Sequence, residues 1–581
     1  MLQPIVALAL GLAGTFLQCA AAAAPSDSDW QALHDAVGGR LFTAEPLARP
    51  CFSTFNGQTV KPDENRCAIV AGDYRNGSIG TDSYAGFVHT YNEACASNVT
   101  DQCLPPTGDF TAGSVSGQCN QGTLSERYIT VAGAKDVQAA LGFARRTGVT
   151  LSVKATGHDY AGRSSRKGSL ALWTRKLDSL DYAPSFTPLG SSAPPVQALT
   201  IGAGVNLGEV YAFADRHNVT FVGGSSGTVT AAGGYTLFGG HGVLTPLYGM
   251  GADRVLEFRI VTPDGEFRTA NEATNPDLFW ALRGGGGAAF GVVLDATFKV
   301  EPAMPLTLSL MRFDATATNT GPFLSLLMNR STAWAEEGWG GPMDASTLAL
   351  LTPNLDLDVA NRSMEPVAAY VTAQGGNVVL ERHPSFYSFY SKYVAASSST
   401  GAGTATFATF RVLPKRLHRS DEGRAAVAST FQAMMAAGLK PYVFQTAPSS
   451  YAYVPGSNAV HPAWRDSYWL VGTSLSWESN GAGLEERVRA AALLQEVSGN
   501  LTTLAPEGSM YPNEADPWTE DWRREFWGEE NYEKLLQIKR KYDPDGLLSC
   551  WKCVGFEDKE METDPAYRCM GAFQSTSRRT L

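Results

Sequence analysis

A strand–helix–strand pattern that runs directly into a glycine-containing turn limits the folds open to this chain. Residues 128–131 and 149–154 are short runs rich in β-branched side chains, which is typical of strands. Between them, residues 134–147 carry apolar side chains at helical spacing. The turn follows from Thr156 onward. This order indicates an α/β arrangement, in which ligands bind beyond the ends of the strands.

The turn at residues 156–165 has the composition of an anion-binding loop. Its glycines allow the backbone to approach a ligand closely, and its hydroxyl side chains add donors. Backbone N–H groups in such a turn form a concave site suited to a pyrophosphate. His158 lies at the centre; from the residues alone, a histidine in a glycine loop is more often structural than catalytic. The candidate ligand-binding residues are Thr156, Gly157, His158, Asp159, Gly162, Arg163 and Ser164.

Two further glycine clusters follow, at residues 223–242 and 284–287. Because ordered glycine has an entropic cost, this density indicates backbone pressed against a ligand. His241 falls within the first cluster, where a buried, hydrogen-bonded histidine is favoured over one that faces the substrate. The candidate binding residues here are Ser226, Gly227, Thr228, Gly233 and Gly234, together with Val261 in a predicted strand that begins at Val255 and precedes the turn Pro263-Asp264-Gly265.

The ordered glycine loops around Gly157-His158-Asp159 resemble the FAD-binding signature of the vanillyl-alcohol-oxidase family. They are most similar to fungal berberine-bridge-enzyme-like oxidases, which have a PCMH-type FAD-binding domain. The resemblance spans residues 120–302 and 505–556. It implies that a ring nitrogen of His158 is bonded to the flavin 8α-methyl carbon, and that the glycine loops hold the pyrophosphate and ribityl chain.

The C-terminal segment resembles the family pattern Y-x-N-x-x-D, followed by G-x-N-Y and K-x-x-x-D-P. The resemblance implies that Asn513 contacts the flavin edge and that Tyr511 lies near the reacting centre, as the first candidate for the catalytic base. A Glu, Tyr or His on the sheet of the middle domain is the alternative base. From the residues alone, an aromatic-rich tail of this kind is also explained by core packing.

The chain departs from the family pattern at several positions. Some members carry a cysteine that makes a second bond to the flavin, and Ser226 stands at that position here. Since a hydroxyl does not form that linkage, we expect attachment through His158 only. Phe238 replaces a common third glycine, and Ala288 and Ala289 replace a usual polar residue before a Phe-Gly pair.

The fold class implied is α+β, with a two-part PCMH-type FAD-binding domain and an α+β substrate domain that has an antiparallel sheet. In the middle of the chain, strands are predicted at 306–313, 370–380 and 467–475, and helices at 322–335, 425–437 and 484–497. The expected divisions are a signal peptide at 1–24, a disulfide-stapled N-terminal region at 25–120, the FAD-binding domain at 121–302, the substrate domain at 303–504, a segment returning to the FAD domain at 505–560 and a tail at 561–581.

The chain begins like a secreted protein. An apolar run from Ile5 to Phe16 precedes small residues, and it is shorter than the roughly 20 residues that span a bilayer. In an oxidising compartment, Cys550-Trp-Lys-Cys553 is more often a disulfide than a zinc site, and no metal is expected. After the leader, five cysteines precede the first motif and three follow the last, so at least one bridge is expected to join the N-terminal region to the tail. N-glycosylation sequons begin at Asn76, Asn98, Asn218, Asn329, Asn361 and Asn500.

These features together predict a secreted FAD-dependent oxidase that acts on an alcohol, sugar or related small molecule, with O2 as second substrate and H2O2 as product. A flavin-dependent dehydrogenase or cyclase of secondary metabolism, and a non-catalytic glycoprotein with a vestigial FAD fold, are the alternatives. The net charge of −11 argues against nucleic acid or anionic membrane as a partner. A nicotinamide dehydrogenase is disfavoured because no G-x-G-x-x-G follows an early strand.

Overall fold

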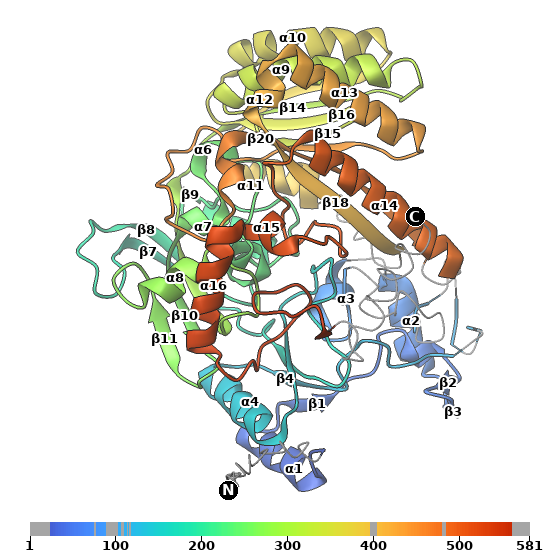
Figure 1. Ribbon diagram of the computed structural model, residues 1–581, viewed down its shortest axis with the longest axis vertical. Helices are drawn as coiled ribbons and strands as arrows, with labels where there is room; N and C mark the ends of the chain where they lie inside the picture. Colours follow the sequence, from blue (N-terminus) through green and yellow to red (C-terminus); the bar gives the residue numbers. More distant parts are fainter. Residues whose placement is uncertain are drawn as a thin grey trace, which may run out of the picture.

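The computed structural model describes residues 24–74, 77–88, 103–105, 110–112, 114–115, 118–395, 404–478 and 484–560. Nearly all of the predicted signal peptide and the whole tail therefore lie outside the described residues. Figure 1 shows a helix-covered sheet at the top of the molecule and a lower unit with further sheets beneath it. Among the described residues, no helix combines the length and apolar character needed to cross a bilayer.

The first sheet of the lower unit holds the predicted strand–helix–strand pattern. Its order is β1-β4-β6-β5, and β4, β6 and β5 run parallel. Helix α4 (Ala134–Thr147) joins β4 to β5 and has the bounds expected from the sequence. The strands are β1 (Leu41–Thr43), β4 (Arg127–Thr130), β5 (Leu151–Lys154) and β6 (Leu170–Trp173). Because β5 ends at Lys154, the glycine turn starts at the carboxyl end of a parallel strand, as the sequence predicts.

The N-terminal region contributes directly to this sheet. Strand β1 pairs antiparallel with β4, and α1 (Asp27–Ala36) packs on α4. Leu33 and Val37 share a core cluster with the interior of α4. Residues 27–43 are therefore structurally part of the lower unit rather than of a separate N-terminal region.

A second, antiparallel sheet completes the lower unit, with the order β11-β10-β12-β8-β7. Helix α5 (Leu207–Arg216) contributes its apolar side to the same core as this sheet, and so do α8 (Pro276–Leu282) and α16 (Glu529–Tyr542) from the C-terminal segment. The chain thus returns to the lower unit after the middle domain. The strands are β7 (Leu180–Phe186), β8 (Val196–Gly202), β10 (Val255–Val261), β11 (Phe267–Ala270) and β12 (Val292–Lys299).

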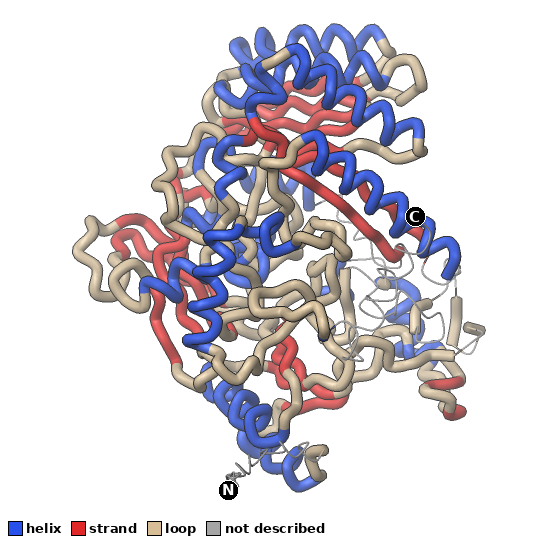
Figure 2. The backbone as a smooth tube through the Cα atoms, viewed as in Figure 1, coloured by secondary structure: helices blue, strands red, loops and turns tan. Residues whose placement is uncertain are grey.

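The middle domain is a seven-stranded antiparallel sheet with the order β17-β14-β16-β15-β19-β20-β18. Figure 2 shows helices covering its outer face, and their apolar sides form a core of their own with the sheet. The strands are β14 (Leu306–Arg312), β15 (Gly341–Asp344), β16 (Thr347–Thr352), β17 (Asn377–His383), β18 (Thr404–Pro414), β19 (Tyr442–Gln445) and β20 (Ser467–Glu478). The covering helices are α9 (Thr320–Glu336), α10 (Leu357–Ala373), α13 (Asp421–Ala436) and α14 (Leu484–Leu504). The predicted α+β fold class is confirmed.

One predicted strand of this domain is wrong. Residues 370–373 belong to α10, and the strand begins only at Asn377. The β-branched pair Val371-Thr372 suggests a strand locally, but Ala360, Met364, Val367 and Val371 are all buried at helical spacing. Tertiary burial along that stripe determines the conformation.

Disulfides join Cys51 to Cys67, Cys103 to Cys119 and Cys550 to Cys553. The C-terminal CxxC is thus a disulfide, as expected. Cys95 and Cys569 lie outside the described residues. The expected bridge between the N-terminal region and the tail therefore stays a prediction. The sequon asparagines Asn218, Asn329, Asn361 and Asn500 are exposed, whereas Asn76 and Asn98 fall outside the described residues.

Candidate functional site

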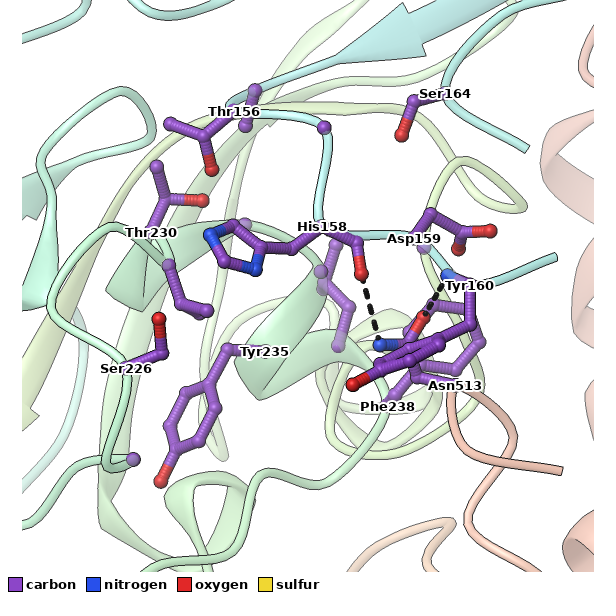
Figure 3. A pocket seen from close by; sticks show the side chains of 18 of the residues that line it. Thr156, His158, Asp159, Tyr160, Ser164, Ser226, Thr230, Tyr235, Phe238 and Asn513 are labelled. Carbon is purple, nitrogen blue, oxygen red and sulfur yellow. Dashed lines mark hydrogen bonds between the residues drawn. The ribbon is translucent and has the colours of Figure 1, made fainter. Parts of the chain in front are cut away.

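A cavity of about 340 Å³ lies where both sheets of the lower unit meet the middle sheet and the C-terminal segment. This volume is within the range of small-molecule and cofactor sites. Its walls include the turn after β5, the 224–234 glycine loop and the stretch at 287–291. Figure 3 shows His158 among the side chains that line this cavity.

The turn after β5 is folded by its own charged pair. Gly157 and Gly162 adopt φ of +85° and +75°, a left-handed region that disfavours side chains with a Cβ. The Asp159 carboxylate accepts hydrogen bonds from the backbone N–H of Ala161 (2.9 Å) and of Arg163 (3.0 Å). It also accepts one from Arg163 Nε (2.8 Å). Asp159 and Arg163 therefore compensate each other's charge and fix the turn.

His158 is held from two sides. Its Nε2 lies 2.8 Å from the hydroxyl of Thr228, and its carbonyl accepts a hydrogen bond from Asn513 Nδ2 at 3.2 Å. Asn513 Oδ1 in turn accepts from the backbone N–H of Tyr160 (3.3 Å) and from Arg163 (3.4 Å). Asn513 therefore fastens the C-terminal segment to the turn that carries His158, as Figure 3 shows.

The glycine loop leaves room where a cofactor would lie. A Cβ placed on Gly234 meets no protein atom within 4 Å, and Gly234 lines the cavity. Its absent side chain is thus part of the open volume. Hydroxyl side chains of Thr156, Ser164 and Ser226 line the same cavity. A glycine-walled cavity with hydroxyl and backbone donors fits the phosphate and ribityl groups of FAD.

The structure brings most of the predicted binding residues to one place. The lining includes Thr156, Gly157, His158, Asp159, Arg163, Ser164, Ser226, Gly233, Gly234, Tyr511 and Asn513. The remaining four, Gly162, Gly227, Thr228 and Val261, lie behind it. Of these, Thr228 contacts His158, and Val261 is fully buried in β10. Phe238, which stands where relatives often have a glycine, also lines the cavity. The centroid of its ring lies 4.6 Å from the guanidinium carbon of Arg163, within the range of a cation–π contact.

The sequence predicts a substrate domain at 303–504 but does not identify which of its residues line the site. Pro342 on β15, Phe444 on β19 and Thr446 beyond it close one end of the cavity. No glycine cluster or motif marks these segments, because their position depends on the pairing of β15 with β19. Glu514 was also missed, although it directly follows Asn513 and lines the same cavity.

Tyr511 is 5% exposed and its hydroxyl is occupied by backbone. It accepts a hydrogen bond from the Gly240 N–H and donates one to the Tyr235 carbonyl, both at 3.3 Å. Burial and the nearby Glu514 carboxylate hold the pKa of Tyr511 well above its usual value. The phenol therefore stays protonated and braces the loop at 235–240.

Two family profiles match the chain. One, described as "FAD binding domain", matches residues 125–271, and the other, described as "Berberine and berberine like", matches residues 510–550. These two stretches supply most of the lining of the cavity. They also correspond to the two parts of the lower unit that the middle domain separates.

The chain is similar to fungal flavoproteins over nearly its whole length. It is 68% identical to the FAD-linked oxidoreductase OXR2 of Pyricularia oryzae over 559 residues, which covers 95% of this chain and 96% of that one. Among solved structures, it resembles the VAO-type flavoprotein MtVAO615 of Myceliophthora thermophila, with a TM-score of 0.79, 28% identity and coverage of 91% and 95% of the two chains. A glucooligosaccharide oxidase of Acremonium strictum shares the fold at a TM-score of 0.59 and 20% identity, with 74% of this chain and 92% of that chain covered.

Proposed function

The chain belongs to the berberine-bridge-enzyme-like branch of the vanillyl-alcohol-oxidase family and is an FAD-linked oxidoreductase, and we propose that it is a secreted oxidase of alcohols, sugars or related small molecules with FAD attached to His158. The observation that carries the proposal is the glycine-walled cavity with His158 at its centre and the open space beside Gly234.

His158 is suited to covalent attachment because neighbouring residues hold its side chain and backbone in place. The contacts with Thr228 and Asn513 restrain both its ring and its backbone at the wall of the cavity. The Acremonium enzyme carries a 6-S-cysteinyl, 8α-N1-histidyl FAD, and Ser226 here cannot supply the first of these links. The proposal is therefore a single link, through His158.

The bound FAD supplies the acceptor for a hydride and passes its electrons on to O2, giving H2O2. The protein's own part is to hold the substrate against that cofactor and to take the hydroxyl proton. Phe444 and Pro342 form apolar walls at the end of the cavity that the middle domain closes, and Thr446 adds a hydroxyl there. Asn513 and Tyr511 keep the C-terminal wall fixed against the turn and the glycine loop.

Secretion and glycosylation belong to the same proposal. The sequon asparagines within the described part of the chain are exposed, two of them on the outer helices α9 and α10 of the middle domain. Local disulfides in both the N-terminal region and the C-terminal segment suit an oxidising compartment.

If the protein is an oxidase of alcohols or sugars, such a substrate reduces the bound flavin under anaerobic conditions. The purified holoenzyme is mixed anaerobically with a panel of primary and secondary alcohols and oligosaccharides, and flavin absorbance is followed. We expect bleaching with at least one class, followed by rapid recovery and peroxide formation when air is admitted. Bleaching that recovers only with an artificial acceptor would identify a dehydrogenase instead.

A further inference from the structure

His241 and Glu514 form a polar pair at the end of the cavity that the middle domain closes. His241 Nε2 lies 3.3 Å from Glu514 Oε1, and Nδ1 lies 3.0 Å from the Thr446 hydroxyl. The three residues come from the glycine loop, the C-terminal segment and the middle domain, and all line the cavity. The pair itself lies within the lower unit, and the contact with Thr446 links it to the middle domain.

The partners of the two ring nitrogens are consistent with one arrangement of hydrogens in a neutral His241. An ionised carboxylate can only accept, so Nε2 carries the hydrogen that points to Glu514. Nδ1 then accepts from Thr446. With both ring nitrogens engaged, His241 orients the carboxylate.

One carboxylate oxygen of Glu514 can still accept a hydrogen bond. Its second oxygen, Oε2, is buried and makes no hydrogen bond. The side chain is 21% exposed and that of His241 is 11% exposed, so the pair is shielded but borders the cavity. The titratable groups packed around it are Tyr160 and Tyr511, and burial keeps both phenols protonated by raising their pKa values.

We propose that Glu514 is the catalytic base of the oxidation and that His241 is its positioning residue, an inference that rests on the proposed function. We favour Glu514 over Tyr511 because the Tyr511 hydroxyl is already engaged by the Tyr235 carbonyl and the Gly240 N–H. The general base thus comes from the C-terminal segment and not from the middle sheet.

The oxidation breaks two bonds of the substrate. The O–H bond of the substrate alcohol breaks and its proton passes to the Glu514 carboxylate, which becomes a neutral acid. The C–H bond on the adjacent carbon breaks, and its hydrogen leaves with both electrons to the FAD of the proposed function. The product is the carbonyl compound, and the carboxylic acid is later deprotonated by solvent.

The test uses 4-nitrophenol as a probe, because its neutral and ionised forms differ in colour and its hydroxyl mimics that of an alcohol. A carboxylate accepts a hydrogen bond from the neutral phenol and repels the phenolate. We therefore expect the wild-type holoenzyme to bind the neutral form preferentially, and Glu514→Gln to lose at least about tenfold of that preference. Glu530→Gln makes the same charge change on an exposed part of α16 and serves as control.

Two further variants test whether Tyr511 is the base instead and whether His241 positions Glu514. Tyr511→Phe is expected to retain the preference for the neutral probe, and His241→Phe to weaken it. With an alcohol that reduces the flavin, Glu514→Gln is expected to slow reduction by about 10²–10⁴-fold.

The possible results separate a failure of the Glu514 assignment from a failure of the proposed oxidase function. A wild type without preference for the neutral probe, or a preference that survives Glu514→Gln and disappears in Tyr511→Phe, overturns the assignment. A Glu514-dependent preference in an enzyme that no alcohol reduces supports Glu514 as the acceptor and contradicts the proposed function.

Discussion

Replacing Gly234 with leucine is expected to leave the protein folded but without flavin. The added side chain meets no protein atom near its Cβ, so it enters the cavity without disturbing the walls. Gly234 lacks a positive φ, so its backbone conformation is open to leucine. The space it would fill is the space assigned to FAD, and we expect bound flavin to fall by at least about tenfold, the effect of 1.4 kcal/mol.

The measurement is the flavin-to-protein absorbance ratio of the purified variant, together with its thermal unfolding. Gly72→Leu is the matched control, because a Cβ on this exposed residue of α2 (Glu64–Asp73) also meets no protein atom within 4 Å. We expect the control to keep its full flavin content. Full flavin content in Gly234→Leu would place the cofactor elsewhere.

Replacing Arg411 with methionine is expected to be among the most destabilising single changes in the chain. Arg411 is fully buried on β18 and pairs with Glu525 of α15 (Trp522–Trp527), itself 3% exposed. It also donates to the Ala505 carbonyl at 2.7 Å. Removing the guanidinium leaves a carboxylate and carbonyls buried with fewer partners, at a cost of about 3–5 kcal/mol.

Arg416→Met provides the comparison for Arg411→Met. Arg416 pairs with Glu507 at the surface, where the two side chains are 55% and 45% exposed. Exposed pairs of this kind contribute about 0–1 kcal/mol. Denaturant and thermal unfolding should therefore separate the two variants clearly. Equal effects would mean that the Arg411–Glu525 pair does not hold the C-terminal segment to the middle domain.

The local parts of the fold could be predicted from the sequence. Helix α4 and the turn after β5 depend on periodicity and glycine placement within some 30 residues, so a local pattern determines them. The strand predicted at 370–380 failed because β-branched residues in α10 are buried along a helical stripe. Strand β1 was missed because its partner, β4, lies far along the chain.

In the candidate site too, local motifs could be predicted from the sequence and contacts between distant segments could not. The turn, the glycine loops and Asn513 carry recognisable motifs, and the structure brings most of these residues to one cavity. The contact of His241 with Glu514 joins residues 273 positions apart, and Thr446 comes from a third segment. No local pattern reports such a contact, so His241 was interpreted as a buried, hydrogen-bonded residue.

Covalent attachment of FAD at His158 is tested most directly by denaturing the secreted protein in acid and recording the absorbance of the precipitate. The same treatment is applied to His158→Ala and to His34→Ala, a control at an exposed histidine of α1. We expect flavin absorbance in the wild-type and His34→Ala precipitates and none in that of His158→Ala. A colourless precipitate from folded wild-type protein would contradict the covalent link and leave at most a dissociable cofactor.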